Sequence, residues 1–328
     1  MAAHRIGMTR ILASALLALA AMPALAQSAP WPSKPIRYIV PFAPGGTTDI
    51  LGRMVAAGLA PALGQPVVVE NKPGQAGSVG SAELARAAPD GYTLGGGTIS
   101  SHAINVTLYP KLPYDPVKDF APITMLATLP NMLIVHPSLN VSSVRELVEL
   151  LKANPNRFSF GSAGNGTSQH ISGELFKIMT GTQMQHIPYK GSGPMIPDLI
   201  AGTIQLSFEN ITTAYPQVKG GKLKALAVTS AQRSFVAPEV PAMAEAGLPG
   251  YDITSWQAMF APAGTPREIV ARLHAATAKI LRMPENRDKL GQLGLEPGGM
   301  APDELAALIR AEIPRLGKVV RESGARVD

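Results

Sequence analysis

The sequence contains no cysteine among its 328 residues. This excludes thiolate nucleophiles, iron–sulfur clusters and disulfides, and leaves histidine and carboxylate as the strong metal ligands. Aromatic residues make up only 5%, and the basic residues are spread along the chain, which argues against a nucleic-acid groove with stacking platforms. Charged residues reach only 16% against 46% hydrophobic ones, so the chain has ample material for a folded core.

The first 26 residues have the pattern of a secretory signal peptide. Arg5 and Arg10 precede an apolar run over 11–21, and Ala24 and Ala26 have the small-residue spacing of a cleavage site. The run is too short for an ordinary membrane-spanning helix. We predict cleavage after Ala26 and export to the periplasm, with an uncleaved anchor as the alternative. Removing these residues, which carry two of the 29 basic residues and no acid, lowers the net charge from +6 to +4. Such a charge favours anionic small molecules.

Short β-rich runs alternate with helical patterns along the chain, and this alternation predicts an α/β architecture with parallel sheets and helical crossovers. At roughly 150 residues per domain, the length fits two sheets and two domains. We expect strands at 36–40, 67–70, 92–94, 132–135, 158–160, 185–187, 205–208 and 225–228, and helices at 48–63, 78–88, 144–153, 168–179 and 195–201.

Several helix ends carry local signals. Gly64 stands where a helix commonly ends. Ser143 with Glu146, and Thr265 with Glu268, have the spacing of a capping box. A proline at 314 interrupts the apolar periodicity of 304–320, which predicts a kink or a break in the last helix.

No flexible linker marks a domain boundary. The runs 131–137 and 256–262 each look like a strand that ends in a proline, and we interpret them as paired connections between two lobes. The expected organisation is residues 1–26 as signal peptide, 27–126 plus 254–328 as lobe 1, and 127–253 as lobe 2.

Two glycine- and hydroxyl-rich loops lie between a predicted strand and a predicted helix. Residues 41–49 (PFAPGGTTD) form the first and 161–170 (GSAGNGTSQH) the second. Glycines let the backbone approach a ligand, and a helix N-terminus offers unpaired N–H groups and a partial positive charge. The spacing matches neither a P-loop nor a dinucleotide fingerprint. Two such loops therefore suggest one anionic ligand held from both sides, with ordinary capped turns as the alternative.

Other candidates are weaker. Residues 98–102 (TISSH) could line the same cleft, although a packed or capping role is common for a histidine such as His102. His170 and Glu174 lie one turn apart but have no third metal ligand in the sequence. Glu209 follows a predicted strand and could accept hydrogen bonds from a ligand's amino or hydroxyl group, or it could be a solvated strand end. We find neither an H-E-x-x-H motif nor a complete nucleophile elbow.

Eight segments together resemble the Bug family, the periplasmic solute-binding receptors of tripartite tricarboxylate transporters. They cover the whole mature chain in order: 31–37 (WPSKPIR), 41–49, 69–74 (VENKPG), 89–94 (PDGYTL), 102–105 (HAIN), 161–166, 188–191 (PYKG) and 260–266 (FAPAGTP). Members of this family often carry Phe-Asp-Asn where this chain has Phe208-Glu209-Asn210, a departure that leaves the ligand open.

The resemblance implies a two-lobed periplasmic-binding-protein (flytrap) fold, each lobe a mainly parallel sheet flanked by helices, that closes on a small organic carboxylate. It implies no catalysis, cofactor or metal. We expect a monomer that delivers its ligand to membrane transporter subunits. From the loops, the third candidate and the resemblance together, the expected ligand-binding residues are Phe42, Ala43, Gly45, Gly46, Thr47, Thr48, Asp49, Ser100, Ser101, His102, Ser162, Ala163, Gly164, Asn165, Thr167, Ser168, His170, Tyr189 and Glu209.

Two alternatives stay open at this point. The receptor could report to a signalling protein instead of a transporter. The chain could also be a hydrolase that uses Ser162 or Ser168 with His170.

Overall fold

The computed structural model describes residues 30–326. The predicted signal peptide lies outside the described residues. The chain divides into two units, Met1–Ser33 and Lys34–Asp328, and all the helices and strands below belong to the second.

The first part of the second unit is a β-α-β-α-β arrangement. Its elements are β1 (Ile36–Val40), α2 (Thr47–Leu63), β2 (Val67–Asn71), the 3₁₀ turn η1 (Gln75–Gly77), α3 (Ser78–Ala85) and β3 (Thr93–Thr98). Strand β1 lies between β2 and β3 and is parallel to both, as right-handed helical crossovers favour. Gly64 ends α2 with φ 73°, a conformation that glycine adopts without strain, and confirms the predicted helix end.

A second set of alternating strands and helices lies further along the chain. It comprises β5 (Ser159–Ser162), α6 (Ser168–Thr180), β6 (Gln185–Pro188), α7 (Ser192–Ile200), β7 (Leu206–Asn210), α8 (Ile211–Lys219) and β8 (Lys224–Val228). Strand β5 pairs in parallel with β6 and β7. The predicted order of strands and helices is therefore correct in both parts, with boundaries that shift by a few residues.

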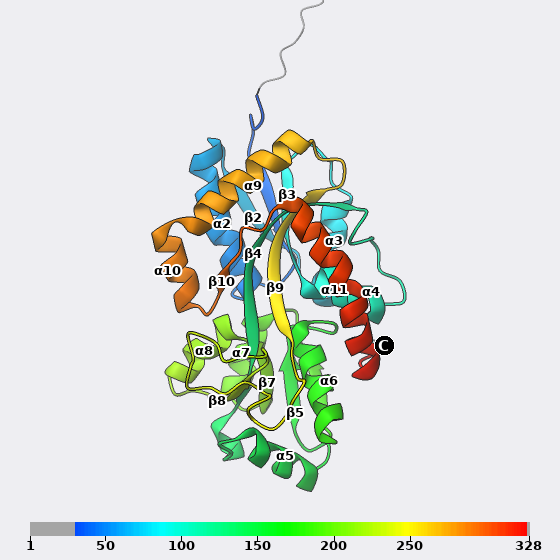
Figure 1. Cartoon of the computed structure of the whole chain (residues 1–328), viewed down its shortest axis with the longest axis vertical. Coiled ribbons are helices and arrows are strands. Elements are labelled where there is room, and N and C mark those ends of the chain that lie inside the picture. Colours follow the sequence, from blue (N-terminus) through cyan, green and yellow to red (C-terminus); the bar gives the residue numbers. More distant parts are fainter. Residues whose placement is uncertain (1–29, 327–328) are drawn as a thin grey trace, which may run out of the picture. The chain divides into compact units, whose positions relative to one another are not determined.

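Two long antiparallel strands run through the middle of Figure 1 and join these sets: β4 (Phe120–Val135) and β9 (Thr254–Pro262). Strand β9 pairs with β3 and with 120–130 of β4, whereas 131–135 of β4 pair with β7 and β8. The predicted runs 131–137 and 256–262 thus belong to two strands, β4 and β9, that pair with each other. The residues of β4 that pair with β9 are 120–130, however, and these precede the predicted run 131–137. The path β2-β1-β3-β9-β4-β7-β5-β6 makes one mixed sheet rather than two separate ones.

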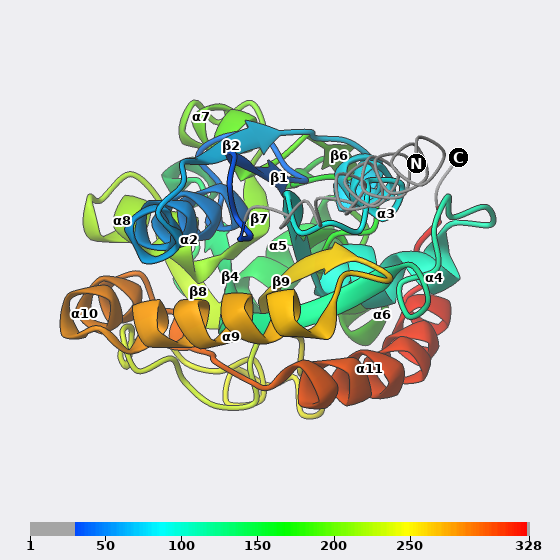
Figure 2. The ribbon, with the colours of Figure 1, turned by 90° about the horizontal axis from the view of Figure 1, so that it is seen from above.

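The short strand β10 (Glu296–Pro297) is also part of this sheet and pairs with β4. The remaining helices are η2 (Ser100–Ile104), α4 (Asn105–Leu108), η3 (Pro137–Leu139), α5 (Val144–Ala153), α9 (Arg267–Arg282), α10 (Pro284–Gln292) and α11 (Pro302–Glu322). Figure 2 shows α9 and α11 along one side of β4 and β9, and both helices contact β4.

The predicted helix ends are partly correct. Ser143 Oγ accepts from Glu146 N at 3.1 Å and caps α5. The capping box at Thr265 is wrong, because α9 begins at Arg267 and Thr265 Oγ1 donates instead to Pro262 O at 2.8 Å. The final helix α11 is not split, since it continues through Pro314.

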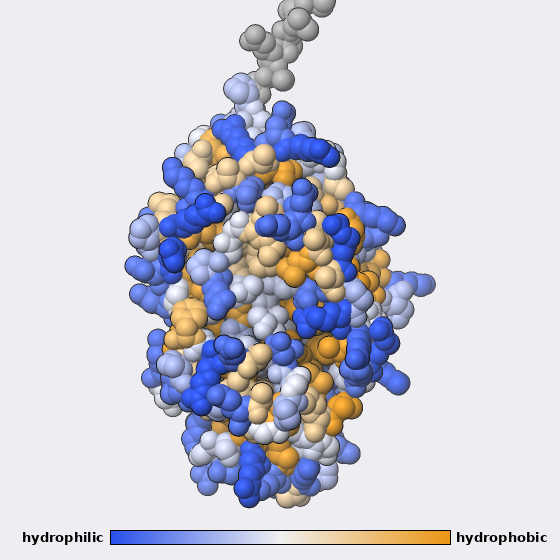
Figure 3. All heavy atoms as spheres, in the orientation of Figure 1, coloured by the Kyte–Doolittle hydropathy of each residue, from blue (hydrophilic) through white to orange (hydrophobic). Residues whose placement is uncertain are grey.

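Two apolar clusters fill the interior. One packs α11 against η2 and β9 around Phe260, and the other packs α5 and α6 against β5 and β7 around Phe160, Phe176 and Phe208. The face shown in Figure 3 is a mixture of hydrophilic side chains and small apolar areas. None of the helices in residues 30–326 is long and apolar enough to cross a membrane.

We expect Phe176→Ala to lower the free energy of unfolding by about 3–5 kcal/mol. It removes a fully buried ring whose centroid lies 5.4 Å from the ring centroid of Phe208. Urea denaturation followed by circular dichroism measures the loss. Phe235, which is 55% exposed, provides the matched control, and Phe235→Ala should change stability by no more than about 0.5 kcal/mol. Equal losses in the two variants would contradict the assignment of the core.

Candidate functional site

Two strand-to-helix loops face each other in the structure. Residues 41–46 connect β1 to α2, and residues 163–167 connect β5 to α6. Gly46 caps α2 without a side-chain hydrogen bond, whereas Thr167 Oγ1 caps α6 by accepting from His170 N at 3.3 Å. Each loop therefore brings the electropositive end of a helix to the same place.

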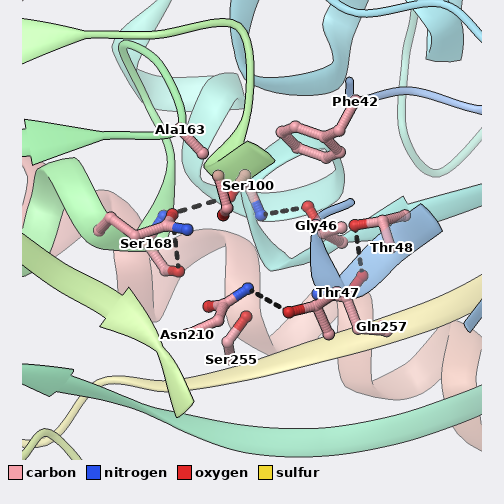
Figure 4. Close-up of a pocket in the computed structure, with 13 residues that line it drawn as sticks. Phe42, Gly46, Thr47, Thr48, Ser100, Ala163, Ser168, Asn210, Ser255 and Gln257 are labelled. Atoms are coloured by element: carbon pink, nitrogen blue, oxygen red, sulfur yellow. Dashed lines mark hydrogen bonds between the residues drawn. The ribbon is translucent and has the colours of Figure 1, made fainter. Parts of the chain in front are cut away.

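A small polar pocket lies between these loops, with a cavity volume of about 20 Å³ (Figure 4). A cavity of this size holds about one water molecule and is well below the usual size of a ligand pocket. Its thirteen lining residues are polar, small or aromatic: Phe42, Gly46, Thr47, Thr48, Thr98, Ser100, Ala163, Ser168, Gln169, Ser192, Asn210, Ser255 and Gln257. None of the thirteen carries a charge.

Hydrogen bonds link segments that are far apart in the sequence across this pocket. Asn210 Nδ2 donates to Thr47 Oγ1 at 3.1 Å, and Ser168 N donates to Ser100 Oγ at 3.2 Å. Thr48 Oγ1 donates to Gln257 Oε1 at 2.9 Å. The two loops and β9 therefore enclose one polar space.

Seven predicted residues line the pocket: Phe42, Gly46, Thr47, Thr48, Ser100, Ala163 and Ser168. They come from all three predicted loop segments, so the structure brings these segments together. The other twelve predicted residues lie outside the lining and take other roles, described next.

Asp49 supports the first loop from behind. Its Oδ2 accepts from Gly45 N and from Arg53 Nε, both at 3.0 Å, and its Oδ1 accepts from Asn71 Nδ2 at 2.9 Å. Burial alone would raise the pKa of Asp49, but these partners outweigh it and the pKa is lowered. The carboxylate is thus ionised, and Arg53 balances its charge. In the same loop, the backbone N of Ala43 donates to Lys190 O at 3.2 Å.

His102 is a core residue, the alternative that its sequence context left open. Its ring stacks on Phe260 at 4.0 Å between centroids, and its Nδ1 lies 2.9 Å from the Oγ of Ser101. Complete burial lowers the pKa of His102 to about 3, so the imidazole is neutral.

The second loop is supported by a histidine pair. His170 Nδ1 accepts from Gly166 N at 3.1 Å, and the His170 ring stacks on His186 at 4.0 Å. His186 Nε2 in turn lies 2.6 Å from Ser162 Oγ, which accepts from Gly164 N. Burial lowers the pKa of His170 to about 4 and that of His186 to about 2.

This arrangement removes the basis of the hydrolase alternative. Neither Ser162 nor Ser168 contacts His170, because the Ser162 hydroxyl pairs with His186 and the Ser168 hydroxyl lies 3.5 Å from Asn131 Oδ1. His170 Nε2 and Glu174 Oε1 are 4.0 Å apart, and no group of three metal-ligating side chains occurs in the described part of the chain.

Three further predicted residues lie beside the pocket. Asn165 contributes its carbonyl oxygen to Tyr109 OH at 2.8 Å. Tyr189 OH donates to Asp198 Oδ2 at 2.6 Å. Glu209 is completely buried and accepts from Ser192 Oγ at 2.7 Å, so it stands directly behind the pocket wall.

Six lining residues were not among the expected ligand-binding residues, although two of them, Thr98 and Gln169, lie within the predicted segments 98–102 and 161–170: Thr98, Gln169, Ser192, Asn210, Ser255 and Gln257. Some signals for them exist in the sequence. Ser192 follows Gly191 at a third strand-to-helix turn, and Ser255 and Gln257 lie two residues apart on β9, so their side chains share one face of the strand. A sequence pattern alone does not show which face of β9 points into the pocket.

Comparisons with known proteins show the family to which the chain belongs. Residues 51–325 match the family described as "Tripartite tricarboxylate transporter family receptor". The chain is 37% identical to Protein BugT of Bordetella pertussis over 323 residues, which covers 98% of this chain and 99% of BugT.

Two similar structures come from Rhodopseudomonas palustris. The protein Rpa4515, described with adipate, is 40% identical, with a TM-score of 0.88 over 90% of this chain and 100% of that one. MatC, described with bound malate, is 35% identical, with a TM-score of 0.85 over 88% of this chain and 100% of that one.

The buried histidines make stability depend on pH. His102, His170 and His186 stay neutral when folded, with pKa values of about 3, 4 and 2, whereas the unfolded chain takes up protons below the ordinary pKa of 6.5. The free energy of unfolding should therefore fall between pH 7 and pH 5, by about 2 kcal/mol for each histidine. Urea denaturation at the two pH values measures the difference.

The variant His102→Phe tests this cause. It should reduce the difference between pH 7 and pH 5 by about 2 kcal/mol, whatever its effect on stability at pH 7. The raised pKa of Glu209 acts in the opposite direction but is common to both proteins. A difference that is unchanged in the variant would refute the assignment.

Proposed function

Because the chain belongs to the tripartite tricarboxylate transporter receptor family, the periplasmic solute-binding receptors that include the Bug proteins, we propose that it captures a small organic carboxylate and delivers it to its transporter. Members of this family are binding proteins and not enzymes. The relatives described with adipate and malate support a dicarboxylate-sized acid as the ligand class.

One observation carries the proposal: the pocket presents hydroxyls and two helix N-termini without a charged lining residue. A carboxylate can be held by such donors, since a hydrogen bond to a charged group contributes about 1.5–3 kcal/mol. The hydroxyls of Thr47 and Ser100 are candidates to donate, because each accepts a hydrogen bond across the pocket and has a proton of its own.

We assign residues 27–126 plus 254–328 to lobe 1 and 127–253 to lobe 2. Hydrogen bonds from Ala43 N to Lys190 O, from Asn210 to Thr47 and from Ser168 to Ser100 then join the lobes. The chain crosses between the lobes within β4 and again where β9 begins, and these two crossings would act as the hinge, the usual arrangement for ligand-driven closure.

We also propose that the protein is exported to the periplasm through the signal peptide at 1–26 and acts as a monomer.

The alternative is that the receptor delivers its signal to a signalling protein and not its ligand to a transporter. Deletion of the gene should abolish uptake of the acid that the protein binds, whereas a purely signalling role would leave uptake unchanged and alter only the cellular response.

We expect Gly46→Leu to abolish carboxylate binding and preserve the fold. A Cβ at Gly46 would lie 3.7 Å from Ser192 Cβ, in ordinary contact, so the rest of the leucine side chain would occupy the pocket. A thermal-shift panel of succinate, glutarate, adipate, malate and benzoate on the wild type identifies the binder, which stabilises by about 2.7 kcal/mol at 100 times its Kd. Calorimetry with that acid then compares the variant.

Gly291→Leu is the matched control, because Gly291 lies in α10 with open space around it. It should bind as the wild type does. Gly164 is a poorer target, since its φ of 133° strains any other residue. Retained affinity in Gly46→Leu would refute the pocket as the binding site.

Closure is expected to follow binding. Without ligand, the lobes should separate about β4 and β9, so adding the panel acid should decrease the radius of gyration in small-angle X-ray scattering. Gly46→Leu should show no decrease. A radius that stays constant in the wild type, despite binding by calorimetry, would refute hinge closure.

A further inference from the structure

One wall of the pocket offers hydrogen-bond acceptors to a ligand. Ser192 Oγ donates its single proton to Glu209 Oε1 at 2.7 Å, so only its lone pairs are left for the pocket. Asn210 Nδ2 is engaged with Thr47 Oγ1, and the buried Oδ1 of Asn210 has no partner. Both residues line the pocket, and both present an acceptor to it, of which Asn210 Oδ1 is unsatisfied.

A buried carboxyl group stands behind this wall. Glu209 is 0% exposed, and its Oε1 accepts from Ser192 Oγ, Thr213 Oγ1 and Asn210 N at 2.7, 2.7 and 2.9 Å. Its Oε2 has no partner, and Glu209 forms no ion pair with any residue in 30–326. An uncompensated buried carboxylate is costly, which favours any arrangement that brings a cation nearby.

Helix ends hold this carboxylate in place. Ser192 is the first residue of α7, and Asn210 caps α8, so two helix N-termini are close to Glu209 and favour its ionised form. Burial nevertheless raises the pKa of Glu209, against the lowering effect of Ser192, Thr213, the Asn210 backbone N–H and the side chain of Gln169. The helices thus offset only part of the cost of burial.

We propose that the ligand is an organic acid that also carries an ammonium group, and that Glu209 is the positioning residue that selects it by fixing the proton of Ser192. The inference rests on the proposed function. The carboxylate of such a zwitterion faces the hydroxyls and helix ends of α2 and α6, and the ammonium group donates to Ser192 Oγ and Asn210 Oδ1 with the charge of Glu209 behind them.

Matched ligands test this selection. We would measure calorimetric affinities for three pairs that differ by an amino group: succinate with L-aspartate, glutarate with L-glutamate, and butanoate with 4-aminobutyrate. At least one amino acid should bind the wild type ten times or more tightly than its partner. Glu209→Gln keeps the shape and the acceptor Oε1 but removes the charge. It should reduce this advantage of the amino acid at least tenfold, and it should change the affinity of the matched acid without an amino group less than threefold.

Glu149→Gln is the control for loss of one negative charge, because the side chain of Glu149 is 63% exposed on α5. It should leave both members of each pair unchanged. If Glu209→Gln does not fold, Ser192→Ala removes the acceptor and keeps the carboxylate, and it should lose the same advantage.

The inference is overturned if the acids without an amino group bind as tightly as the amino acids, or if Glu209→Gln weakens both members equally. It is also overturned if none of the six compounds binds. The proposed function fails only if, in addition, no acid of the wider panel binds, so the two failures are distinguishable.

Discussion

The structure depends on two helix N-termini, those of α2 and α6, meeting at one small pocket. Each leaves backbone N–H groups that no intrahelical carbonyl accepts, and each carries about half a positive charge. Hydroxyls add mobile donors beside them. Because these partial charges are fixed to the sheet by β1 and β5, the pocket is polarised before any ligand enters, and little reorganisation is needed when an anion arrives.

A neutral lining has a consequence for release as well as for capture. An arginine in so small a pocket would form a bidentate pair with a carboxylate, and separating such a pair in a poorly hydrated space is costly. For the delivery proposed above, many modest hydrogen bonds would be an advantage, because they could break one by one if the proposed lobes separate. The bonds between Thr47 and Asn210 and between Ser100 and Ser168 are of this kind, since each could exchange with a ligand or with water.

The sequence predicted the order of elements and the two loops because both follow from local rules: alternating periodicities, glycines at positive φ and helix caps. It did not predict how β4 extends to Phe120, nor that Ser192, Ser255 and Gln257 reach the pocket. Those features depend on which strands pair and which face each strand presents, and such non-local information is not contained in spacing. The sequence can also suggest a binding role for a residue that is structural. His102 and His170 were expected to bind ligand, but their rings stack on Phe260 and on His186, respectively.

Two carboxylates stand behind the pocket, and the difference between them bears on the ligand. Asp49 faces Arg53 at 3.0 Å, so its charge is balanced within the protein and the first loop is electrically neutral as a unit. Glu209 has no such cation within residues 30–326, and its Oε1 accepts instead from the hydroxyls of Ser192 and Thr213. When Glu209 is ionised, the wall near it is the negative end of a pocket whose other end carries two helix N-termini, and a molecule with both charges would align with this field.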